Sequence, residues 1–192
     1  MTTPQIVNPL PLQTEFPPVA DVEFQQSELN IPIVSGGEVK EILKMTAVLR
    51  LDRGAPVTNA GGHRQFEFAI EQWEVAGFSE TFGEFVTITL SDTPQPRSLA
   101  IAQQAGNDYP AIIVYNAIFD VYVGKRRVAE KVTGLGVGVD AYEVPPRVNI
   151  QFQKAFPLGG GIEASAGACA EETALNEGDF QAKVDEFRQL RG

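Results

Sequence analysis

The feature of this sequence that most constrains its fold is an apolar residue at every second position, repeated in successive segments from about residue 20 to residue 156. The longest such run spans 113–123, where the odd positions are apolar and the even ones include Asn116 and Asp120. Alternation of this kind is typical of β-strands that are buried on one face and solvated on the other. Shorter runs of the same type cover residues 45–51, 66–70, 86–90 and 148–152.

Strands that are apolar on one face must bury that face against another layer, and no helical pattern occurs between these runs to supply one. The remaining solutions are a second sheet or closure of the sheet into a barrel. We therefore predict an all-β fold, an antiparallel β-sandwich or flattened barrel of about seven strands, and we favour the sandwich. Gly124 and Lys125 predict a tight hairpin, and the break in alternation at Glu71 and Gln72 predicts a β-bulge.

The chain divides by composition into three parts. Residues 1–18 contain five prolines and form an extended N-terminal arm, because proline favours polyproline-like backbone and interrupts helices. Residues 19–158 form the β-sandwich domain. Residues 159–192 form a Gly/Ala-rich connection, either loop or weak helix, followed by a short C-terminal amphipathic helix.

Three apolar residues near the C-terminus recur at helical spacing, namely Phe180, Val184 and Phe187. Asn176 is a suitable N-cap for this helix, and Asp179 lies near the positive end of its dipole. A helix this short is marginal in isolation, so its apolar stripe must pack on its own domain or on another chain.

Charge and composition argue against several classes of function. With 25 acidic and 15 basic residues, the formal net charge of −10 opposes binding to nucleic acid or to anionic membrane surfaces. The candidate basic patch, residues 125–127, is interpreted as a solvated hairpin turn. No apolar stretch approaches the length of a membrane-spanning helix, and the N-terminus lacks the pattern of a signal peptide. The single cysteine favours a reducing compartment, and we predict a cytoplasmic protein.

The sequence predicts no catalytic, cofactor-binding or metal site. His63 is the single histidine, which excludes metal sites built on a histidine pair, and Cys169 lies among acidic neighbours that do not favour a reactive thiolate. The glycines of residues 134–138 do not complete a dinucleotide-binding motif, because Val139 stands where the third glycine belongs. Alternating glycines in a β-protein more often allow close approach of the backbone. The balance is against an enzyme.

Two hypotheses for function follow. The first is a non-enzymatic interaction or structural protein, self-associating or part of a larger assembly, although the arm and helix could equally cover their own domain. The alternative is a barrel or sandwich that binds a small apolar ligand in a cavity of several hundred Å³, on the order of 300 or more. For the first hypothesis, the candidate interaction residues are Phe180, Val184, Phe187, Leu10, Leu12 and Phe16.

Overall fold

The computed structural model describes residues 14–144, 150–152, 155–165, 168–169 and 173–191. In this part of the chain, the pairings between strands are antiparallel. The strands are β1 (Asp21–Ser35), β2 (Glu38–Arg53), β3 (Val57–Thr58), β4 (Arg64–Ser79), β5 (Glu84–Leu90), β6 (Ser98–Ala102), β7 (Ala111–Val123), β8 (Arg126–Ala141), β9 (Ile150–Phe152), β10 (Phe156–Gly159), β11 (Ile162–Ala164), β12 (Ala168–Cys169) and β13 (Thr173–Ala174), and a helix follows, α1 (Glu177–Arg191).

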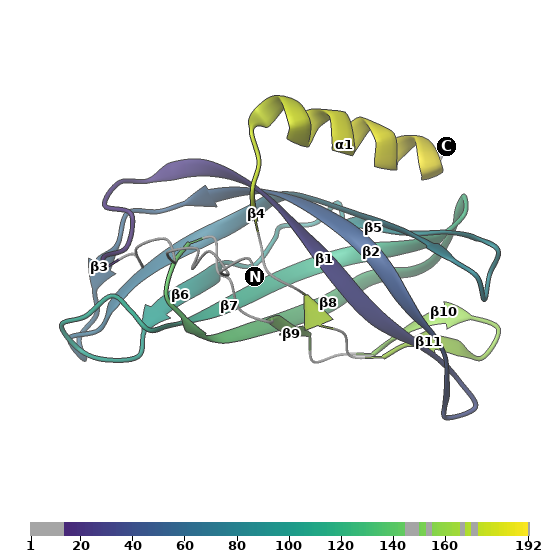
Figure 1. Ribbon diagram of the computed structural model, residues 1–192, viewed down its shortest axis with the longest axis horizontal. Helices are drawn as coiled ribbons and strands as arrows, with labels where there is room; N and C mark the ends of the chain where they lie inside the picture. Colours follow the sequence, from purple (N-terminus) through teal and green to yellow (C-terminus); the bar gives the residue numbers. More distant parts are fainter. Residues whose placement is uncertain (1–13, 145–149, 153–154, 166–167, 170–172, 192) are drawn as a thin grey trace, which may run out of the picture.

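The strands form one sheet that closes on itself. Its order runs β1-β12-β9-β8-β7-β5-β4-β2, and β2 pairs again with β1. In Figure 1, β1 and β2 run at an angle to β7 and β8, as expected for opposite walls of a flattened barrel. The all-β prediction is confirmed, and of the two architectures that we considered the structure has the barrel. Closure leaves the apolar faces of the strands in a shared interior.

The barrel closes along two walls that flank β1. The ladder between β1 and β2 extends from Asp21 opposite Arg53 to Ser35 opposite Glu38. Between β8 and β1, the described wall consists of β9 and β12, with Gln151 opposite Ala168 and Ile150 opposite Cys169. We call this β9–β12 wall the seam.

Two local predictions are confirmed. The chain turns from β7 into β8 at Gly124 and Lys125, as the hairpin prediction required. In the pairing of β2 with β4, Arg50 lies opposite Gln72 while Leu51 lies opposite Ile70, so that Glu71 is an extra residue. This is the β-bulge that the break in alternation predicted.

The Gly/Ala-rich connection contains strands, where we expected loop or weak helix. Residues 159–161 turn the chain from β10 into β11 with positive φ angles of 96°, 63° and 78°, which glycine adopts at little cost. Strands β11, β12 and β13 then pair with β1. The edge of β1 that faces away from β2 would otherwise expose unpaired backbone groups, and these short strands satisfy them. The β-structure therefore extends past residue 158.

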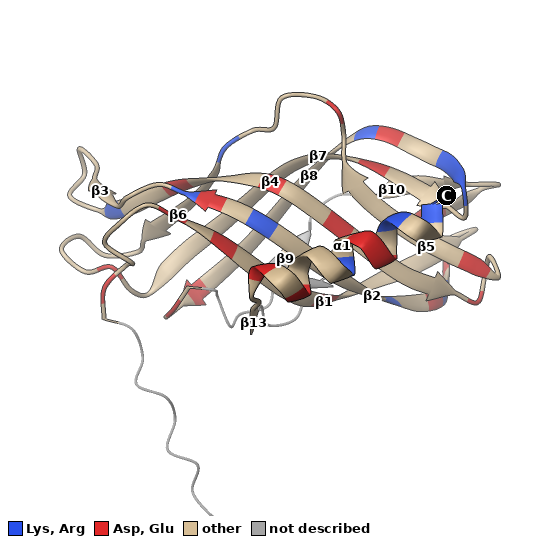
Figure 2. Cartoon of the chain, turned by 90° about the horizontal axis from the view of Figure 1, so that it is seen from above, with Lys and Arg blue, Asp and Glu red and all other residues tan. Residues whose placement is uncertain are grey.

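Helix α1 lies on the outer face of the barrel, as Figure 2 shows. The side-chain oxygen of Asn176 accepts a hydrogen bond from the backbone N–H of Asp179 at 2.8 Å, which caps the first turn. The apolar stripe is buried against Val48 of β2 and Ala76 of β4. No helix in the described part of the chain combines the length and apolar character needed to cross a membrane. The buried stripe residues are Phe180, Val184 and Phe187.

The last turn of α1 is tied to the barrel by a buried carboxylate. Glu74 of β4 is 2% exposed, and its Oε2 accepts a hydrogen bond from Nη1 of Arg191 at 2.6 Å. Nε of Arg188 donates to the other carboxylate oxygen at 3.4 Å. A carboxylate buried under a helix is tolerated only when cations or donors compensate it. The ion pair therefore sets where the helix ends on the sheet.

We expect Arg191→Met to lower the free energy of unfolding by about 2 kcal/mol, because it leaves the buried Glu74 charge with the half-exposed Arg188 as its cation, beside the hydroxyl of Thr89. Denaturant unfolding measures this loss. The control Gln189→Ala, on the exposed side of the same helix, should change stability by less than about 0.5 kcal/mol. Adding Glu74→Gln to Arg191→Met should restore part of the loss. Equal stability of Arg191→Met and the original chain would contradict this role.

Candidate functional site

The side chains that β1 contributes to the barrel interior change from polar to apolar along the strand. Buried residues of this strand occur at every second position, beginning with Gln25 and Ser27 and continuing with Leu29, Ile31 and Ile33. A strand that alternates in this way lines the interior with one set of side chains. One end of the interior is therefore polar and the other apolar, and each end contains a cavity.

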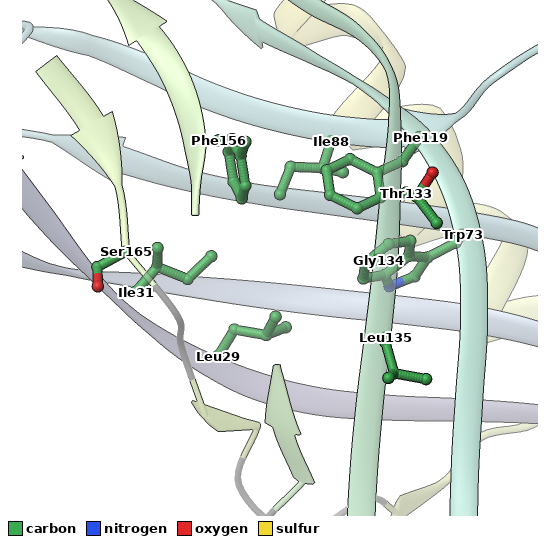
Figure 3. A pocket seen from close by; sticks show the side chains of 10 residues that line it. All are labelled: Leu29, Ile31, Trp73, Ile88, Phe119, Thr133, Gly134, Leu135, Phe156 and Ser165. Atoms are coloured by element: carbon green, nitrogen blue, oxygen red, sulfur yellow. The ribbon is translucent and has the colours of Figure 1, made fainter. Parts of the chain in front are cut away.

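The apolar cavity is lined from several walls of the barrel, as Figure 3 shows. Among the described residues that line it, none carries a charge. The space open to the centres of water-sized molecules is about 30 Å³, although the hollow reaches about 420 Å³ when its mouth to solvent is included. The smaller volume limits what fits, and it corresponds to one or two water molecules. The lining residues are Leu29, Ile31, Trp73, Ile88, Phe119, Thr133, Gly134, Leu135, Phe156 and Ser165.

Aromatic rings in edge-to-face contact form one side of the apolar cavity. The ring of Phe119 lies 5.6 Å from that of Trp73 and 5.5 Å from that of Phe156, with interplanar angles of 90° and 81°. Gly134 of β8 lies against the same ring, since a Cβ at this position would come within 2.7 Å of Cε1 of Phe119. The interpretation of these glycines as positions of close approach is confirmed at Gly134, and β8 continues as a strand past it.

The apolar cavity lies beside the seam. Leu29, which lines it, is opposite Cys169 of β12 in the sheet register. On the other side, Gly136 of β8 is opposite Phe152 of β9, next to the lining residues Thr133–Leu135. The cavity thus lies between β1 and β8, next to the seam that joins them.

The polar end contains a buried ion pair and a buried amide. Nε of Arg53 donates to Oε1 of Glu23 at 2.6 Å, and the Arg53 side chain is 4% exposed. The side-chain N–H of Gln25 donates to the other oxygen of Glu23 at 3.2 Å. Oε1 of Gln25 has no hydrogen-bond partner among the described residues. A second space of about 10 Å³ lies here, lined also by Phe68 and Tyr115.

The N-terminal segment closes this end of the barrel. The ring of Phe16 is 2% exposed and contacts Phe66 and Tyr109 edge-on, each at 5.0 Å between ring centroids. The backbone N–H of Phe16 donates to Oδ2 of Asp108 at 2.7 Å. Nη1 of Arg53 donates to the carbonyl of the nearby Val19 at 2.8 Å. Phe16 therefore acts as a plug that carboxylate and guanidinium groups hold in place.

Burial and neighbouring charge also act on Tyr109, the residue whose ring contacts Phe16. Desolvation of the Tyr109 hydroxyl, with the carboxylates of Asp108 and Glu143 nearby, raises the pKa of Tyr109 well above its ordinary value. Tyr109 therefore stays neutral throughout the physiological range and contributes no charge to this end of the barrel.

The interaction residues predicted from the sequence are buried by other parts of this same chain at every described position. Phe16 is buried in the end of the barrel, and the helix residues Phe180, Val184 and Phe187 are buried on its outer face. Leu10 and Leu12 lie outside the described residues. Sequence reasoning did not identify Gln25 and Arg53, although a glutamine and a serine at alternate positions of an otherwise apolar strand face are a readable signal.

The single histidine lies at the barrel end, away from the apolar cavity. Nδ1 of His63 is 2.8 Å from the carbonyl oxygen of Ala102, and its backbone N–H donates to the side chain of Asn59 at 3.1 Å. These contacts hold the loop that precedes β4. Among the described residues, no three His, Cys, Asp or Glu side chains are grouped so as to hold a metal ion.

Comparison with known proteins shows the fold. No protein-family model and no curated protein matches the sequence. Among solved structures, DynF from the dynemicin biosynthesis pathway of Micromonospora chersina superposes with a TM-score of 0.68. The match covers 92% of this chain and 91% of DynF at 13% sequence identity. At this identity the likeness shows a common fold and says nothing further about chemistry.

We expect Gly134→Ala to destabilise the barrel by about 1–3 kcal/mol, because the added Cβ forces Phe119 from its edge-to-face packing. The control Gly61→Ala, in an exposed turn with ordinary contacts, should cost less than about 0.5 kcal/mol. Thermal and denaturant unfolding of the two variants measure the difference. Equal stabilities would show that Phe119 yields freely and that this side of the cavity is soft.

Proposed function

We propose that this protein binds a small apolar molecule in the interior of its barrel. The observation that carries the proposal is the apolar cavity, lined by Trp73, Phe119 and Phe156 and located beside the seam. Ligand sites in proteins are typically concave and mainly apolar, with a few polar groups that set orientation. The interior has this composition, because its polar groups are gathered at one end.

The volume of the cavity implies that binding is coupled to opening. Ligand sites commonly have roughly 300–1,000 Å³, many times the space that is enclosed here. The proposed point of entry is the seam, because Leu29 in the cavity lining lies opposite Cys169 of β12. The likeness to DynF supports this proposal at the level of the fold alone.

A direct test uses the position of Trp73, which is the single tryptophan of the chain. Diphenylhexatriene, a neutral hydrocarbon, absorbs where tryptophan emits and fluoresces strongly in apolar surroundings. We expect saturable energy transfer from Trp73 to one bound probe. Leu29→Phe, which occupies cavity space, should weaken probe binding about tenfold, a loss of about 1.4 kcal/mol.

The matched control is Val139→Phe, at a position of β8 whose side chain is 53% exposed. It adds a phenylalanine outside the cavity and should leave probe affinity unchanged. Absence of saturable transfer in the original chain would overturn ligand binding. Equal loss in both variants would show that the probe binds the surface.

A second candidate, self-association, is favoured by an exposed aromatic pair. Phe78 and Phe85 are 52% and 39% exposed, and their rings contact each other at 5.4 Å beyond the end of α1. They border an open groove whose rim carries Glu84 together with Lys125 and Arg126. The occupant proposed for this surface is a second copy of the chain, since a two-fold interface would bury the aromatic pair and bring Glu84 of one copy near Lys125 or Arg126 of the other.

Under this second proposal the chain is a dimer, and replacing Phe78 and Phe85 together by serine should make it a monomer of unchanged stability. Light scattering over a range of protein concentrations measures the mass. Val139→Ser, which removes an exposed apolar residue elsewhere, is the control and should stay dimeric. A monomeric original chain at every concentration would refute self-association.

A further inference from the structure

The amide of Gln25 has an acceptor that nothing in the described chain uses. The side chain is 1% exposed, its N–H donates to Glu23 at 3.2 Å, and its Oε1 has no partner. The opposite amide orientation would place Oε1 against the Glu23 carboxylate, acceptor against acceptor, so the ion pair sets which way the amide points. Buried acceptors in native proteins are almost always satisfied. No described residue supplies a donor to this one, and a bound molecule with a donor group would satisfy it.

The surrounding charges define the kind of donor. The carboxylate of Glu23 and the guanidinium of Arg53 lie 2.6 Å apart and neutralise each other. Nη1 of Arg53 also donates to the backbone carbonyls of Pro17 and Val19, at 3.3 and 2.8 Å. A further ion buried here would lack a counter-charge, and burying an uncompensated ion is costly. The donor that fits is therefore neutral.

The side chains around Gln25 indicate what kind of molecule carries the donor. Phe68 contacts Phe66 and Tyr115, with ring centroids 6.2 and 5.2 Å apart. The space beside Gln25 is about 10 Å³, so the group that enters is as small as a hydroxyl or an N–H. The apolar cavity begins at Leu29, four residues further along β1, or about 13 Å away. A rod-shaped apolar body with one polar end matches both cavities.

We infer that the ligand is a neutral, elongated apolar molecule, aromatic or polyunsaturated, with a terminal hydroxyl or N–H that donates to Oε1 of Gln25. This inference rests on the proposed ligand-binding function and specifies its substrate class. The terminal donor occupies the small space beside Gln25, and the apolar body occupies the cavity at Trp73. Gln25 thereby selects against hydrocarbons that lack a donor and against acids that carry a charge.

Four stilbenes of similar shape test the inference: stilbene, 4-hydroxystilbene, 4-methoxystilbene and stilbene-4-carboxylate. Their affinities are measured by calorimetry and by displacement of diphenylhexatriene from the intact chain at neutral pH. We expect 4-hydroxystilbene to bind about tenfold more tightly than the methoxy compound, which offers no donor, and than the carboxylate. Gln25→Met keeps the approximate volume and removes the acceptor, so it should abolish the preference for the hydroxyl compound over the methoxy compound.

The control variant is Thr87→Val, which removes the other buried side-chain atom without a hydrogen-bond partner among the described residues. Thr87 is not among the residues that line the two interior cavities, so the ligand preference should persist. If the hydroxyl and methoxy compounds bind equally, or the carboxylate binds most tightly, the inference fails while ligand binding stands. If diphenylhexatriene binds and none of the four stilbenes does, the inference fails and ligand binding stands; if the probe does not bind either, both proposals fail. The comparison of ligands on the original chain decides the matter even where Gln25→Met does not fold.

Discussion

The rest of the structure depends on the pairing of β1 along both of its edges. One edge forms a continuous ladder with β2, and the other is satisfied in pieces by β11, β12 and β13. Without those pieces the sheet would stay open and expose a long row of unpaired backbone groups. Closure turns the alternating apolar faces of all the long strands into one interior. The backbone N–H groups of Ser165 and Leu175 donate to the carbonyls of Pro32 and Phe24, and they add to the pairing along this second edge.

Charged groups hold the elements that cover this barrel, although apolar contacts supply most of the burial. Asp108 and Arg53 bind the backbone around Phe16 at one end, and Glu74 binds the last turn of α1 on the outside. Buried ion pairs of this kind contribute less to net stability than apolar packing does, but they are costly to break in part. The charged groups set the positions of Phe16 and of α1, and apolar side chains supply the packing that stabilises both.

Much of the fold was readable from the sequence because it rests on local periodicity. The alternation predicted the long strands, the phase break predicted the bulge at Glu71, and the spacing of Phe180, Val184 and Phe187 predicted the C-terminal helix. The choice of a barrel was not readable, because alternation shows which face of each strand is apolar and leaves open whether the sheet closes. The polar end was missed for another reason. Phe24 packs outward against Phe180 at 5.0 Å, so the polar Gln25 is the residue that faces inward.

The small apolar cavity and the unpaired acceptor are two aspects of one arrangement. A barrel filled by side chains to ordinary density gains the full dispersion energy of its core and has no reason to leave an acceptor such as Oε1 of Gln25 unpaired. A barrel with a permanent large cavity would forfeit much of that packing energy whenever it is empty. An interior that is nearly closed avoids this second cost, because the empty chain stays packed. Under the proposed function, a molecule that brings apolar surface and one donor compensates for the contacts that break when the interior opens.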